Sequence, residues 1–227
     1  MPQRFDGCGM CYEAAVQEAI AFAGQPHRVY VEAKVRRLLE LARRRLGEGP
    51  LDVLDVGCGI GLIDRELVQY VGSLHGVDVS EAMVERARET VPGVDYRVYD
   101  GARLPYEDGQ FDLAFAICVL HHVAAPEQLP LLQEMRRVVR PGGLVIAFEH
   151  NPWNPLTRKV VRSCAFDVDV ELLPRGKLAA AFRAADIEVT DTDYLLFSPW
   201  RSPLVETVER RLRRLPLGAQ YVVAGVT

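Results

Sequence analysis

Short apolar runs alternate with stretches of helical periodicity along most of the chain. Apolar residues recur at helical intervals over residues 29–46, and a Gly-Glu-Gly-Pro sequence then predicts the end of that helix. Further helices are predicted directly after the first strand, over 81–90 with Ser80 as N-cap, and over 129–139. Strands are predicted at the short apolar runs of residues 51–56, 74–79, 94–99, 111–117 and 144–149. Because such strands need cover on both faces, the pattern predicts a doubly wound, Rossmann-like α/β sheet.

The C-terminal part departs from this rhythm. Strand patterns at residues 187–197 and 220–226 flank an arginine-rich helical pattern at 204–214. These two late strands are not joined by a regular βαβ crossover, which is what parallel neighbours require. We therefore expect one of them to lie antiparallel at the edge of the sheet.

The motif with the most chemical content is Leu-Asp-Val-Gly-Cys-Gly-Ile-Gly at residues 54–61. Gly57, Gly59 and Gly61 follow a predicted buried strand, where they allow a sharp turn and close approach of a ligand to the backbone. A helix N-terminus with free N–H groups follows. A dinucleotide loop would place its third glycine at Leu62, and Asp55 would repel a pyrophosphate but accept hydrogen bonds from a cationic amine. The motif thus favours a nucleotide-type cofactor other than NAD.

Composition narrows the class of protein. The 227 residues, 49% hydrophobic and 26% charged, are sufficient for one well-cored domain with additions. A net charge of −4 argues against a nucleic-acid substrate. No apolar run of membrane-spanning length and no secretory N-terminus is present, so we expect a cytoplasmic protein without membrane insertion. The pair Cys8 and Cys11 lacks the second pair that a zinc site needs, so no metal is predicted.

Four motifs in order resemble the class I S-adenosylmethionine-dependent methyltransferases. They are the loop at residues 54–61, Asp78 at the end of the second strand, Asp100 after the third, and Arg-Pro-Gly-Gly at 140–143. Residues 151–157 with 166–169, and residues 215–221, resemble bacterial small-molecule (type 11-like) methyltransferases. This resemblance implies a seven-stranded sheet with an antiparallel edge strand, an N-terminal helical lid over residues 1–46 and an S-adenosylmethionine-binding domain over 47–227.

Several residues are expected at the cofactor. Asp78 follows a strand, where a carboxylate accepts hydrogen bonds from both ribose hydroxyls. Asp100 is suited to accept from the adenine amine, with Gly101 and Ala102 permitting close approach, although an exposed turn aspartate is the alternative. Met83 covers the adenine or packs in a helix core. The full expected set is Tyr12, Asp55, Gly57, Cys58, Gly59, Gly61, Asp78, Val79, Met83, Asp100, Gly101, Ala102, Cys118 and His122.

Candidate proton acceptors follow the fourth and fifth strands. His121 and His122 come where the resemblance places the substrate mouth, and a histidine titrates near neutrality. Glu149 is the other candidate, at the start of a loop over residues 149–155 that we expect to face the substrate. Alternatively, one histidine packs against the cofactor and the other caps a turn.

The sequence therefore predicts methyl transfer from S-adenosylmethionine to a small-molecule acceptor. The Asn/Asp-Pro-Pro-Tyr motif of adenine-N6 enzymes and the Pro-Cys pair of cytosine-C5 enzymes do not occur after the fourth strand. In-line attack on a sulfonium methyl needs mainly alignment of the reactants, with optional proton removal, so O-, N- and C-acceptors all remain open. Two alternatives are an NAD-dependent oxidoreductase and a non-catalytic S-adenosylmethionine-binding protein. The oligomeric state is left open.

Overall fold

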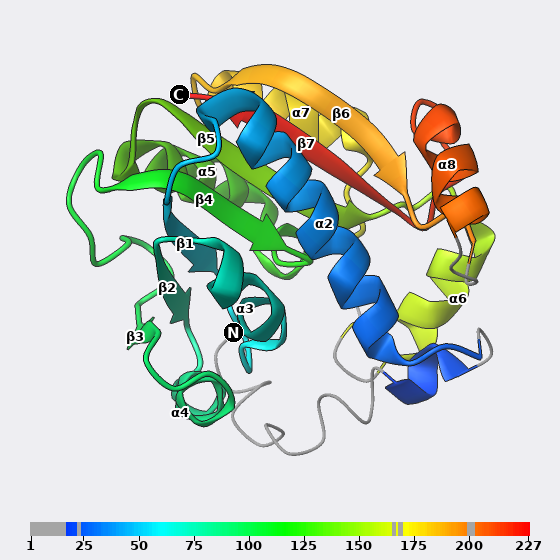
Figure 1. The fold of residues 1–227 in the computed structure, drawn as a ribbon, viewed down its shortest axis with the longest axis horizontal. Coiled ribbons are helices and arrows are strands. Elements are labelled where there is room, and N and C mark those ends of the chain that lie inside the picture. Colours follow the sequence, from blue (N-terminus) through cyan, green and yellow to red (C-terminus); the bar gives the residue numbers. More distant parts are fainter. Residues whose placement is uncertain (1–16, 22–23, 165–166, 168–169, 199–202) are drawn as a thin grey trace.

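The structure is a computed structural model that describes residues 17–21, 24–164, 167, 170–198 and 203–227. A single sheet of seven strands runs through the molecule in the order β3-β2-β1-β4-β5-β7-β6 (Figure 1). The strands are β1 (Asp52–Val56), β2 (Ser73–Asp78), β3 (Asp95–Val98), β4 (Phe111–Ile117), β5 (Val139–His150), β6 (Glu188–Leu195) and β7 (Gln220–Val226). The larger helices are α2 (His27–Leu46), α3 (Leu62–Leu67), α4 (Glu81–Thr90), α5 (Ala125–Val138), α6 (Pro155–Ser163), α7 (Arg175–Ala184) and α8 (Pro203–Leu212).

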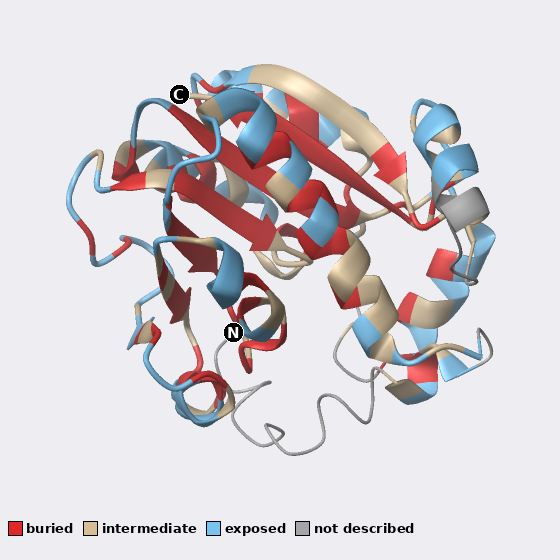
Figure 2. Cartoon of the chain, viewed as in Figure 1, coloured by how far each residue is buried: buried red, intermediate tan, exposed pale blue. Residues whose placement is uncertain are grey.

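The sheet has a hydrophobic core on each face, because strand side chains alternate between faces. In β4, Leu113 and Phe115 pack on one face, whereas Ala114 and Ala116 pack on the other. Helices α2, α3 and α4 contribute to the first of these cores, and α5 and α7 contribute to the second. Figure 2 shows the central strands buried between these helical layers, whereas β6 is mostly intermediate. The predicted doubly wound sheet is confirmed.

The antiparallel strand is β7. It pairs antiparallel with residues 144–150 of β5 on one side and with β6 on the other. The strand is therefore one place in from the edge, and β6 itself is the edge strand. A nearly continuous apolar sequence explains this position, since six of its seven residues are buried. The half-polar β6, with mostly intermediate exposure, suits the edge.

Helix α2 belongs to the core layer of the fold. Val31, Val35, Leu38 and Leu41 are buried on the sheet face. The segment expected to form a lid, residues 1–46, therefore contains α2, which packs against the sheet. The first turns of α2 also border the cavity described below. The expected contact of Tyr12, like Cys8 and Cys11, lies outside the described residues.

Two local expectations differ from the structure. The Pro-Gly-Gly sequence at residues 141–143 predicts a turn ahead of the fifth strand, but β5 already begins at Val139. This sequence instead forms an irregularity inside β5, where the register with β4 shifts between Phe111 and Leu113. Helices α6 and α7 were not predicted, although Asn154 caps α6 by accepting from the N–H groups of Leu156 and Thr157.

Candidate active site

The glycine-rich loop turns from β1 into α3 with positive φ at Gly57, Gly59 and Gly61. The N–H groups of Gly57 and Cys58 donate to the carbonyl of Val77 at 2.7 and 3.0 Å, which fixes the loop against β2. A Cβ on Gly57 would lie 2.5 Å from Val119, and one on Gly61 would lie 2.9 Å from the Tyr96 hydroxyl. A Cβ on Gly59 would meet no protein atom within 4 Å. The lack of a side chain at Gly59 therefore leaves room for a ligand. At Gly57 and Gly61 it leaves room for Val119 and Tyr96 to pack against the loop.

Asp78 connects the end of β2 to this loop. One carboxylate oxygen accepts the Gly59 N–H at 2.9 Å, and the other accepts the Ser80 N–H at 3.0 Å. Ser80 in turn caps α4 by accepting the Met83 N–H. Burial raises the pKa of Asp78, while the backbone N–H groups of Ser80 and Gly59 act in the opposite direction. Asp78 thus organises the site as well as bordering it.

A pair of buried acids lies behind the loop. Burial and the charge of Asp64 raise the pKa of Asp55 well above its usual range, and burial raises the pKa of Asp64 to about 6. The Tyr96 hydroxyl donates to Asp64 at 2.8 Å. Two acids that cannot both ionise easily share a proton at neutral pH. Asp55 borders the cavity, so an approaching cationic group would favour its ionised form.

Asp100 lies in an exposed turn after β3. Its Oδ1 accepts the N–H groups of Ala102 and Arg103 at 2.9 and 3.0 Å, and these bonds lower its pKa. Gly101 in this turn has φ +81°, and its Cβ position lies 3.4 Å from Val79. Asp100, Gly101 and Ala102 do not border the cavity, whereas Val79 and Met83 do.

A cavity of about 380 Å³ opens beside the loop, at the carboxyl ends of the parallel strands. Most of its lining is apolar. Beyond the expected residues Asp55, Gly57, Cys58, Gly59, Asp78, Val79, Met83, Cys118 and His122, it includes side chains that sequence reasoning missed. These come from α2 (Tyr30, Val31, Lys34), α6 (Leu156, Thr157, Val160), the following segment (Cys164, Asp167) and β7 (Gln220).

The double histidine lies on a short 3-10 helix, η4 (Leu120–His122), that follows β4. Glu149, fully buried at the end of β5, accepts the Leu120 N–H at 2.8 Å and faces His121 Nδ1 at 2.6 Å. Burial alone would lower the pKa of His121, but the charges of Glu149 and Asp167 raise it to about 10. His121 and Glu149 do not border the cavity, whereas His122 does. Of the three expected proton acceptors, only His122 thus meets the site where a substrate would lie.

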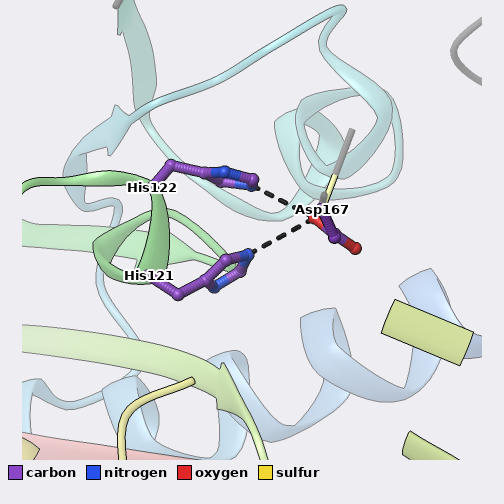
Figure 3. A group of neighbouring side chains, drawn as sticks. All are labelled: His121, His122 and Asp167. Atoms are coloured by element: carbon purple, nitrogen blue, oxygen red, sulfur yellow. Dashed lines mark ion pairs between the residues drawn. The ribbon is translucent and has the colours of Figure 1, made fainter. Parts of the chain in front are cut away.

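Asp167 joins the two histidines. Its Oδ1 lies 3.3 Å from His122 Nε2 and 3.6 Å from His121 Nε2, and Figure 3 shows both rings pointing toward this carboxylate. Both histidines lower the pKa of Asp167, against the effect of burial. Sequence reasoning gave Asp167 no role, because it lies far from the histidines along the chain and outside any strand-end motif.

Further polar groups line the cavity near the ends of β5 and β7. The Gln220 side chain donates to Cys118 Sγ at 3.3 Å and lies 3.4 Å from His150 Nδ1. Its buried Oε1 has no hydrogen-bond partner among the described residues. Burial and the nearby His121 charge lower the pKa of His150 to about 4, and burial raises the pKa of the Cys118 thiol to about 12. His150 and Cys118 are thus uncharged groups at neutral pH.

The residues around the loop fit S-adenosylmethionine. Gly59 presents open space, Asp55 offers a carboxylate to a cationic amine, and Asp78 lies where ribose hydroxyls bind in Rossmann-like sheets. With the strand order and antiparallel β7, this site defines a class I methyltransferase fold.

Comparisons with known proteins agree with this assignment. The methyltransferase domain family matches residues 54–147. The chain is 32% identical over 173 residues to a ubiquinone biosynthesis O-methyltransferase of Pseudomonas paraeruginosa, covering 68% of this chain and 72% of that protein. It is 36% identical over 156 residues to an uncharacterized 37.1 kDa protein in transposon TN4556 of Streptomyces fradiae, covering 66% of this chain but only 44% of that protein. An S-adenosylmethionine-dependent methyltransferase from Mesorhizobium loti shares the fold, with a TM-score of 0.60, 22% identity and coverage of 83% of this chain and 96% of that chain.

The chain therefore belongs to the class I S-adenosylmethionine-dependent methyltransferases, and its cofactor is S-adenosylmethionine. Family membership sets aside the NAD-dependent oxidoreductase and the non-catalytic binding protein as alternatives. None of the helices in the described residues has the length and apolar character needed to cross a membrane.

Proposed function

We propose that the protein methylates a small molecule that binds in the cavity between the glycine-rich loop and α6. The observation that carries this proposal is the cavity of about 380 Å³, bordered by Gly59 and Asp78 at one side and by Leu156 and Val160 of α6 at another. A cavity of this size, mostly apolar with a few polar groups, is typical of small-molecule sites. The ubiquinone biosynthesis O-methyltransferase to which the chain is similar supports such an acceptor.

The protein's main contribution is positioning. S-adenosylmethionine supplies a methyl group on a sulfonium, which is already activated for transfer. The apolar side chains of α2 and α6 would hold the acceptor and exclude water. Gln220 would orient it, since its buried Oε1 is without a hydrogen-bond partner among the described residues and borders the cavity.

His122 is the proton acceptor that the geometry favours where the acceptor atom carries a proton. Its side chain borders the cavity, and Asp167 lies 3.3 Å from its Nε2, close enough to stabilise a charge that the imidazole gains. His121 and Glu149 would act indirectly, because Glu149 holds the η4 turn through the Leu120 N–H and the His121 ring.

Transfer of a labelled methyl group from S-adenosylmethionine tests the proposal. Metabolite, protein and nucleic-acid fractions should be assayed separately, and we expect label only in the metabolite fraction. Val160→Phe, which would narrow the cavity at α6, should raise the KM for the labelled acceptor at least tenfold while the Kd for S-adenosylmethionine changes little. Val208→Phe, on the exposed side of α8, is the matched control. Label in protein or nucleic acid instead would overturn the small-molecule assignment.

A further inference from the structure

Two histidines and one carboxylate converge at the wall of the cavity with the donor set of a transition-metal site. One ring nitrogen from each of His121 and His122 and one oxygen of Asp167 all lie within 4.8 Å of one another (Figure 3). The carboxylate oxygen is 3.6 and 3.3 Å from the two nitrogens. Ligand atoms about 2.0–2.1 Å from a tetrahedral zinc are separated by about 3.3–3.4 Å. The two nitrogen–oxygen distances are therefore close to those of a tetrahedral site.

The surroundings of His121 are those of a metal ligand. Its side chain is 1% exposed, and among the described residues Nε2 makes no hydrogen bond shorter than its 3.6 Å contact with Asp167. Nδ1 lies 2.6 Å from Glu149, whose side chain is fully buried. A carboxylate that accepts from one ring nitrogen directs the lone pair of the other toward a metal, and this carboxylate–histidine arrangement is frequent around zinc.

Charge supports a divalent cation at this position. Glu149 and Asp167 together carry two negative charges when ionised, and they lie on opposite ring nitrogens of one buried histidine. Without a metal, protonated His121 balances one of these charges, and a divalent cation that displaces that proton would balance both carboxylates. His122 and Asp167 border the cavity, so a fourth coordination position would be open to a small molecule there.

We propose that His121, His122 and Asp167 bind a zinc-like divalent cation at the acceptor side of the cavity, with Glu149 orienting His121. This inference rests on the proposed function only for the role of the cation, which would bind an acceptor oxygen and lower the pKa of its hydroxyl group. His122 would then act as a ligand in place of proton acceptor, and the hydroxyl proton, made more acidic by the cation, would pass to solvent water at the cavity. The sequence-based expectation of no metal rested on the absence of a second Cys-x-x-Cys or His-x-x-His pair to complete a site with Cys8 and Cys11, whereas His121, His122 and Asp167 follow neither spacing.

Binding of Zn²⁺ and Co²⁺ alone tests the proposal without any acceptor. The full chain with Cys8→Ser and Cys11→Ser is the starting protein, because these thiols could bind the same ions. Calorimetry should show one Zn²⁺ per chain, and Co²⁺ should give the strong visible absorption of a tetrahedral site without thiolate bands. Asp167→Asn and His122→Gln should weaken Zn²⁺ at least tenfold. Glu149→Gln should weaken it roughly ten- to a hundredfold.

His75→Asn is the control, since His75 pairs with Asp95 at the β2–β3 side of the sheet and should leave metal binding unchanged. Circular dichroism reports whether each variant keeps its fold. Absence of stoichiometric Zn²⁺ binding to the starting protein would overturn the proposal, as would binding that Asp167→Asn leaves intact. Labelled methyl transfer measured with a chelator separates this proposal from the proposed function. Transfer that continues in the chelator would leave the methyltransferase proposal standing while the cation site fails. A rate that falls with chelator and returns with Zn²⁺ would support both.

Discussion

Asp78 accepts the Gly59 N–H at 2.9 Å through one carboxylate oxygen and the Ser80 N–H at 3.0 Å through the other. The acid expected to bind ribose thus also holds the glycine loop and the start of α4 in place. Asp78→Ala should weaken S-adenosylmethionine binding about ten- to a hundredfold, since hydrogen bonds to a charged group contribute roughly 1.5–3 kcal/mol each. Calorimetry measures this change. Glu48→Ala, at an exposed position after α2, is the comparison, and an equal loss in both variants would contradict the special position of Asp78.

Substitutions of two loop glycines should have different effects on cofactor affinity and on the free energy of unfolding. Gly59→Ala places a methyl group in the open space beside the loop and should weaken S-adenosylmethionine at least tenfold, with little loss of secondary structure. Both substitutions place an alanine at positive φ, and Gly57→Ala should lower the free energy of unfolding by about a further 1–3 kcal/mol, because its Cβ would lie 2.5 Å from Val119. Val119→Ala in the Gly57→Ala background should recover part of that loss. The measurements are calorimetry and urea unfolding, and undiminished affinity in Gly59→Ala would contradict the cofactor position.

Asp64→Asn should stabilise the protein in a pH-dependent way. The pKa of Asp64 is raised from 3.8 to about 6 in the folded state, so ionised Asp64 destabilises the fold. This penalty is absent below about pH 4, grows between pH 4 and 6 and stays constant above. The amide oxygen of the substituted side chain would still accept from Tyr96, so the free energy of unfolding should rise by about 1–3 kcal/mol at pH 8 and change little at pH 4. Urea unfolding at both pH values checks this, with Glu48→Gln as the exposed control; an equal effect at both would contradict it.

Cofactor binding should release a proton. The pKa of Asp55 is well above its usual range, so the free enzyme holds a shared proton on the Asp55–Asp64 pair at neutral pH. The cationic amine of S-adenosylmethionine would favour the ionised form, and affinity should therefore rise with pH. Calorimetry in two buffers of different ionisation enthalpy counts the released protons. Asp55→Asn should bind more weakly and release fewer protons, whereas proton uptake by the unsubstituted enzyme would rule out this role for Asp55.

His122→Gln tests the chemistry at the double histidine. The labelled methyl transfer rate should fall about a hundredfold at saturating substrates, while the Kd for S-adenosylmethionine moves little. Glu149→Gln should lower both the rate and the free energy of unfolding, because Glu149 holds the η4 turn and the buried His121. Full activity in His122→Gln would remove this histidine from the mechanism and leave alignment as the main contribution of the protein.

Local sequence was sufficient for several of the elements that carry the glycine-rich loop and its surroundings. The strand over 111–117, the helix over 81–90 and the strand over 220–226 agree with the structure at both ends. The contact of Gly59 with Asp78 could be anticipated because both follow adjacent parallel strands, whose carboxyl ends lie together. The acceptor side of the cavity could not be predicted from local sequence, because α6 carries no strand-like or long periodic signal. The side chains that α6 contributes to the cavity depend on how this short helix packs.

The sequence by itself determined the sheet, the glycine loop and the position of Asp78 at the end of the second strand, because these depend on hydrophobic periodicity and on local motifs. Only the tertiary structure decided that β7 inserts between β5 and β6, that Glu149 is buried beneath His121, and that Asp167 reaches both histidines. The physical reason is that these contacts join segments far apart along the chain. Their geometry is set by the packing of complete elements, which no short stretch of residues encodes.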